Sequence, residues 1–142
     1  MPKNFEKKII GVDFDNTIIN YLNVFKKILR QNKITFGKNL NKAIFKKKII
    51  KKFSENYYTQ IQSILYGKDI LFASKFANVK KNLTKLKKKH TLYLISHKSK
   101  YPILGKKINL RKKALEWLKK NNLYGYKKVF NKKNIFFEEK FD

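Results

Sequence analysis

Residues 9–18 read Ile-Ile-Gly-Val-Asp-Phe-Asp-Asn-Thr-Ile, a short apolar run that ends in two carboxylates. A bounded apolar run of this length is typical of a buried strand in a parallel sheet. Because ligands bind beyond the carboxyl ends of such strands, we expect Asp13 and Asp15 to lie at a binding site. Paired carboxylates suit Mg²⁺, and they can also serve as nucleophile and general acid/base. The alternative is a turn followed by a helix cap, since Asp, Asn and Thr favour both.

A second apolar run, Thr91–Ile95, predicts another buried strand, which ends in Ser96-His97-Lys98. Backbone amides after Ser96, together with the Lys98 or Lys100 side chain, could contact an anion. His97 could act as a general base or metal ligand, although a lone loop histidine is more often a packing residue. Taken alone, a Ser such as Ser96 is more often a turn residue that ends a strand.

The two strand ends together resemble the haloacid dehalogenase (HAD) superfamily. Its first motif is an apolar strand followed by Asp-x-Asp-x-Thr, here Asp13 to Thr17, and its second is a Ser or Thr at a strand end, here Ser96. The resemblance implies that Asp13 attacks phosphorus and that Asp15 acts as general acid/base. It also implies a Mg²⁺ ion held by the Asp13 side chain and the Asp15 carbonyl. The residues expected to hold the phosphate of a small substrate are Thr17, Ser96, His97 and Lys98.

The resemblance covers about residues 8–138, and it implies an α/β fold with a three-layer, doubly wound parallel sheet. Residues 94–105 and the helix after them, which carries Trp117, look like a small bacterial subgroup with an Ile-Ser-His-Lys loop. The family places a small helical cap after the first strand. We therefore expect residues 1–20 and 74–142 to form the core and residues 21–73 to form the cap.

Apolar spacing predicts the helices of both parts. In the expected cap, a helix that Asn20 caps should bury Tyr21, Val24, Phe25, Ile28 and Leu29. Further helices are expected at about 40–53, 55–65, 76–89 and 110–121, with Gly67 ending the 55–65 helix and Asn109 capping the last. A third strand is expected at 134–137, and residues 101–108 should form a loop beside the site.

The charge of the chain is formally +27, from 36 basic and 9 acidic residues, and only Arg30 and Arg111 are arginines. Such a balance attracts phosphates and polyanions, so the alternative function is a non-catalytic basic module that binds RNA or other polyanions. Nucleic-acid readers rely more on Arg, however, and a Lys-, Asn- and Ile-rich composition is what an AT-rich genome favours. We therefore place compositional drift ahead of dedicated nucleic-acid binding. A phosphatase of nucleotides or nucleic-acid ends would use both features.

The remaining composition limits the class of protein. With 142 residues and 42% hydrophobic content, one folded domain is expected rather than a disordered chain. The absence of Cys excludes disulfides and thiolate metal sites. No apolar run is long enough for a membrane span and no signal peptide is visible, which favours a cytoplasmic protein without a membrane partner.

The family pattern is incomplete near the end of the sequence. The third HAD motif is a Lys that neutralises the phosphoryl charge, and the fourth is an acidic residue that completes the Mg²⁺ shell. Lys140 is a weak candidate for the third motif, and no further strand with acids follows Glu139. We therefore expect a HAD domain that is cut short, with an exposed sheet edge, weakened Mg²⁺ binding and reduced or absent activity.

Overall fold

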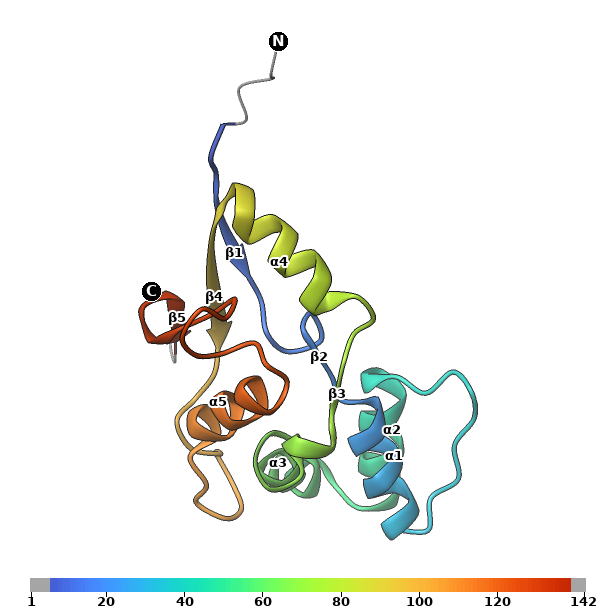
Figure 1. Cartoon of the computed structure of the whole chain (residues 1–142). Coiled ribbons are helices and arrows are strands. Elements are labelled where there is room, and N and C mark those ends of the chain that lie inside the picture. The colour runs from blue at the N-terminus through green and yellow to red at the C-terminus, as the bar shows by residue number, and fades with distance from the viewer. Residues whose placement is uncertain (1–5, 139–142) are drawn as a thin grey trace.

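The computed structural model describes residues 6–138, and its centre is a three-stranded parallel sheet (Figure 1). The strands are β1 (Ile9–Val12), β4 (Thr91–His97) and β5 (Ile135–Glu138), in the spatial order β1-β4-β5. Helices connect all three strands, so the expected α/β class and parallel sheet are confirmed. The expected third-motif candidate Lys140 lies outside the described residues.

The register of β1 against β4 places the two predicted strand ends at one edge of the sheet. Val12 pairs with Leu94 in a parallel ladder. Asp13 therefore leaves the sheet close to the level where β4 reaches Ser96. This common edge is the geometric condition on which the proposed site depends, and an antiparallel or distant pairing would have excluded it.

The two faces of the sheet differ in burial. Leu92 and Leu94 are 2% and 0% exposed on one face, whereas Ile9, Ile95 and Phe136 are 76%, 49% and 43% exposed on the other. The crossovers through α4 (Val79–Lys89) and α5 (Leu110–Lys120) both step in the same direction across the sheet. Right-handed crossovers then put both helices on one face, which agrees with the one-sided burial.

A helical segment is inserted between β1 and α4. It gathers at the end of the molecule away from β1 and β4 (Figure 1). Its parts are α1 (Leu22–Gln31), α2 (Lys42–Lys52), α3 (Glu55–Ser63), a π-helical turn η1 (Ile64–Lys68) and a 3₁₀ turn η2 (Ile70–Phe72). The predicted apolar face of α1 is buried, and Phe25 stacks on Phe45 of α2 with ring centroids 4.5 Å apart.

A short antiparallel stem joins the two ends of this insertion, which the sequence did not predict. Strand β2 (Ile19–Asn20) pairs with β3 (Ser74–Lys75), with Ile19 opposite Lys75. Strands of two residues carry too little periodicity to be recognised in a sequence. The stem closes the chain on itself near the expected boundaries 21–73.

Several predicted helix ends are corrected by the structure. Tyr21, not Asn20, is the N-cap of α1, and the Asn20 side chain instead accepts a bond from the Leu22 amide at 3.0 Å. Gly67 does not end the third helix, because the chain continues through the π-helical turn to Lys68. Helix α4 begins only at Val79, and no helix of residues 6–138 has the length and apolar character needed to cross a bilayer.

One further group of short elements completes the described chain. A 3₁₀ turn, η3 (Lys132–Asn134), precedes β5 and carries a capping box between Asn131 and Asn134. The Asn134 amide also donates to the carbonyl of Leu92 at 3.2 Å. The turn is therefore attached to β4 at the point where β5 enters the sheet. Asn109 caps α5 as predicted, accepting from the Lys112 amide at 3.0 Å.

Trp117 of α5 connects the insertion stem with the loop after β1. Its indole Nε1 donates to the Ala73 carbonyl at 2.9 Å, next to β3. Its ring meets Phe14 edge-on, with centroids 5.6 Å apart. Trp117 is fully buried, so one side chain supports both the turn that carries the carboxylates and the end of the insertion.

We predict that Trp117→Phe lowers the free energy of unfolding by about 2 kcal/mol or more, because the Ala73 carbonyl loses its donor and a void forms. Denaturant unfolding followed by circular dichroism measures this change. The control is Tyr126→Phe, since Tyr126 is 86% exposed and its change should cost less than ~0.5 kcal/mol. Equal midpoints for wild type and Trp117→Phe would contradict the prediction.

Candidate active site

The chain after β1 winds tightly around one carbonyl group. The amides of Thr17, Ile18 and Ile19 all approach the Phe14 carbonyl, at 3.3, 3.0 and 3.3 Å. Asn16 lies at the apex with φ 60°, a left-handed conformation that Asn tolerates better than most residues. The turn holds Asp13 and Asp15 on a fixed backbone, because Phe14 itself is fully buried. The alternative prediction of a simple helix cap does not describe this turn, since α1 starts only at Leu22.

Asp13 is exposed at the carboxyl end of β1. One oxygen of its carboxylate, Oδ1, accepts a hydrogen bond from the Phe14 amide at 2.8 Å. This bond holds the Asp13 carboxylate against the backbone of the turn that follows β1. An exposed, oriented carboxylate can approach an electrophile from solvent.

Asp15 forms an ion pair with Lys98, which lies just past the end of β4. The Lys98 Nζ is 3.2 Å from Asp15 Oδ2 and 3.4 Å from Oδ1. The Lys98 side chain is only 3% exposed and that of Asp15 is 24% exposed. A buried ammonium is costly unless an anion lies beside it, so the two strand ends are joined by charge as well as by the ladder.

The backbone of Lys98 is anchored from two other elements. Its amide donates to the Glu138 carbonyl of β5 at 2.8 Å, and its carbonyl accepts from Arg111 Nε of α5 at 2.9 Å. The ammonium lies 5.4 Å from the ring centroid of Phe14 and 5.0 Å from that of Tyr66. These aromatic faces favour a cation at this position.

Tyr21 is a second partner of Asp15, and sequence reasoning treated it only as a core residue. Its hydroxyl donates to Asp15 Oδ1, and the residue is 1% exposed. Burial, followed by the negative charge of Asp15, raises the pKa of Tyr21 well above its ordinary value. The phenol is therefore neutral and acts as a donor throughout the physiological range. The sequence did not indicate this hydrogen bond, because Tyr21 is spaced with Phe25 as one of several apolar residues on the same helix face.

A cavity of about 610 Å³ opens beside this ion pair, between the helical insertion and the loop after β4. Its volume lies within the range of small-molecule sites. Tyr66 is part of its wall, and burial followed by the charge of Asp15 raises the pKa of this phenol also. The lining residues are Asp15, Lys42, Gln62, Tyr66, His97, Lys98, Ser99, Tyr101, Pro102, Ile103 and Leu110.

The structure groups only part of the predicted site around this cavity. Asp15, His97 and Lys98 line it. Ser96 is 2% exposed beneath the end of β4, and Thr17 is exposed on the turn after β1; neither is part of the wall. Asp13 also lies outside the wall, at the neighbouring strand end. The predicted loop at 101–108 does border the cavity, through Tyr101, Pro102 and Ile103.

The ligand atoms at this edge are oxygens, which a hard cation such as Mg²⁺ prefers, but there are few of them. No group of three or more His, Cys, Asp or Glu residues that could hold a metal occurs within residues 6–138. The Asp15 side chain is engaged by Tyr21 and Lys98, which leaves the Asp13 carboxylate and the Asp15 carbonyl as donors. Mg²⁺ often keeps several waters and binds through one or two carboxylates and the substrate phosphate, so this small set fits it.

The comparisons with known proteins do not identify the chain: no family model matches it, and no match is found among curated proteins.

Proposed function

We propose that this chain is a Mg²⁺-dependent phosphomonoester hydrolase of HAD type that acts through an aspartyl-phosphate on Asp13. The observation that carries the proposal is the ion pair between buried Lys98 and partly buried Asp15, two residues after Asp13, at the common edge of two parallel strands. The pair borders a cavity large enough for a small phosphorylated molecule. A carboxylate nucleophile, a second carboxylate and a cation are the groups that phosphoryl transfer through an aspartyl-phosphate would use.

In the first step of this proposal, an oxygen of Asp13 attacks phosphorus as the bond from phosphorus to the leaving oxygen breaks. The electron pair of that bond stays on the leaving oxygen, which takes a proton from Asp15. In the second step, Asp15 removes a proton from water as the water oxygen attacks phosphorus. The bond from phosphorus to Asp13 then breaks, which releases phosphate, restores the Asp13 carboxylate and leaves on Asp15 the proton that it needs for the next cycle.

Lys98 supplies positive charge to this reaction. Its ammonium is already buried next to Asp15, so it can reach a phosphate in the cavity without a large loss of hydration. His97 lines the same cavity and is a candidate for a further contact with the phosphate, whereas Ser96 and Thr17, which lie outside the cavity wall, would have to move to reach it. Lys98 could thus supply, from the end of β4, the neutralising charge that the family takes from a later Lys.

The metal in this proposal is held by the Asp13 carboxylate and the Asp15 carbonyl. When bound, Mg²⁺ offsets the negative charge of the phosphoryl group and of the attacking carboxylate. The small donor set predicts weak affinity for the ion and, with it, low activity.

The same proposal includes a doubly wound, three-layer fold. A doubly wound, three-layer sheet would have helices on both faces, and the exposure of Ile9, Ile95 and Phe136 lies on the face where a second helical layer would pack. The β2–β3 stem supports a division into a core and a helical cap at residues 21–73. The cavity would then lie between the cap and the core.

We predict that the chain releases phosphate from p-nitrophenyl phosphate in the presence of Mg²⁺ and that Asp13→Asn lowers kcat about a hundredfold or more. The amide is a poor nucleophile of similar shape, so folding should be retained. Release of p-nitrophenolate, followed by absorbance, measures the rate. The matched control is Glu116→Gln, which also removes one carboxylate but lies on α5 in a partly exposed pair with Lys113. Equal rates for wild type and Asp13→Asn would exclude the proposal.

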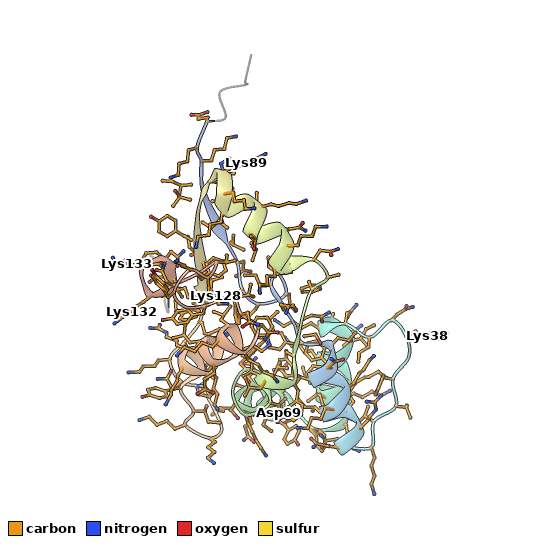
Figure 2. All side chains as sticks on the ribbon, in the orientation of Figure 1. Lys38, Asp69, Lys89, Lys128, Lys132 and Lys133 are labelled. Carbon is orange, nitrogen blue, oxygen red and sulfur yellow. The ribbon has the colours of Figure 1, made fainter. Side chains whose placement is uncertain are left out.

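A second candidate, a non-catalytic module that binds RNA or other polyanions, is favoured by the net charge of +27. Figure 2 shows labelled lysines at widely separated places, with Lys89 near the sheet and Lys38 in the loop after α1. Charge spread in this way supports attraction to polyanions in general rather than one shaped interface.

This second candidate predicts that a labelled single-stranded RNA binds at least tenfold more weakly when salt rises from about 50 to about 200 mM. Release of counterions by many lysine–phosphate contacts is the physical reason. Fluorescence anisotropy measures the affinity, and Asp13→Asn should leave it unchanged. If the affinity for RNA does not change with salt, binding through the lysine charges is excluded.

A further inference from the structure

We propose that Tyr21 is a positioning residue for acid/base chemistry at Asp15, and that it directs proton transfer to the Oδ2 atom. This inference rests on the proposed phosphatase function and adds the residue that orients its general acid/base. Tyr21 is not part of the Asp13–Thr17 motif. It lies four residues beyond Thr17, at the start of the helical insertion. The geometry around the Asp15 carboxylate is the basis of the proposal.

The position of the Tyr21 hydroxyl is fixed by its surroundings. Its ring packs edge-on against Tyr66 with centroids 5.1 Å apart, and Phe25 lies at 6.5 Å. Its backbone caps α1, where the Tyr21 carbonyl accepts from the Phe25 amide at 2.9 Å. A ring buried in this way can move little, so the hydroxyl presents a fixed donor to Asp15.

The two oxygens of Asp15 are consequently not equivalent. Oδ1 accepts the Tyr21 hydroxyl, while Oδ2 is the oxygen nearer to Lys98 at 3.2 Å. When Lys98 turns toward a substrate phosphate, Oδ1 keeps its tyrosine partner and Oδ2 becomes available to take up a proton from solvent. Oδ2 is then the atom that gives a proton to the leaving oxygen and later takes one from water. Without the Tyr21 bond the carboxylate could rotate about its χ2 torsion, which is broad for Asp, and lose this alignment.

A test that compares two leaving groups separates this role from simple packing. The oxygen of p-nitrophenyl phosphate leaves as a stable anion and needs little protonation, whereas the alkoxide of glycerol phosphate needs a proton as it leaves. Tyr21→Phe keeps the ring and removes only the hydroxyl. We expect kcat to fall about tenfold or more with glycerol phosphate and less than about threefold with p-nitrophenyl phosphate, with KM little changed for both.

The matched control is Tyr57→Phe, which removes the hydroxyl of a half-buried tyrosine on α3 whose partner is Asn32 at 3.5 Å. It should leave both rates unchanged, and thermal melting should show that both variants remain folded at the assay temperature. Equal losses of kcat for the two substrates in Tyr21→Phe, or no loss for either, would overturn the inference while the proposed function stands. If Asp13→Asn is as active as wild type, or wild type releases no phosphate, the proposed function fails and the inference with it.

Discussion

The ammonium of Lys98 is buried at the edge of the sheet, and it is stable there because the carboxylate of Asp15 lies beside it. Each charge alone would lose its hydration without compensation, while the pair, with the Tyr21 hydroxyl and two aromatic faces, satisfies both. This requirement joins β4 to the turn after β1 and to the first residue of the insertion. The proposed chemistry would therefore use Lys98 and Asp15, the same two charges that join the strand ends.

The insertion and the core meet at this ion pair from several directions. Tyr21 comes from the start of α1, Tyr66 from the π-helical turn, and Arg111 from α5, where it holds the Lys98 carbonyl at 2.9 Å. A π-helical turn widens the helix by one residue, and such turns are frequent at functional sites. The wall of the cavity is therefore built from both parts of the chain, which makes the insertion a structural component of the site.

The sequence predicted the elements that have strong periodicity. The apolar runs at 9–12 and 91–95 became parallel neighbours, and the spacing of Val24, Phe25, Ile28 and Leu29 marked the buried face of α1. The two-residue stem strands were missed because alternation needs more residues to be visible. Helix ends were misplaced by a few residues; at the start of α1, for example, Asn20 makes a local bond to the Leu22 amide while Tyr21 takes the N-cap position.

The part of the candidate site that follows directly from the strands could be predicted from the sequence. Asp13, Asp15 and Lys98 follow strands, so their position at one edge comes directly from the parallel topology. Whether Lys98 would pair with Asp15, and whether Thr17 and Ser96 would reach the cavity, depends on side-chain direction in loops, which spacing does not encode. Tyr21 could not be separated from its apolar neighbours by sequence, because its proposed role depends on one hydroxyl at the end of a buried ring.

Strand β1 is an edge strand within residues 6–138, since its ladder runs only to β4. Alternate backbone amides of such a strand point away from the ladder, and Ile9 lies exposed on its outer face. Its amides should therefore exchange with deuterium faster than those of β4, which is paired on both sides. The proposed nucleophile Asp13 would then follow a segment able to open locally, while Lys98 follows the strand that is paired on both sides.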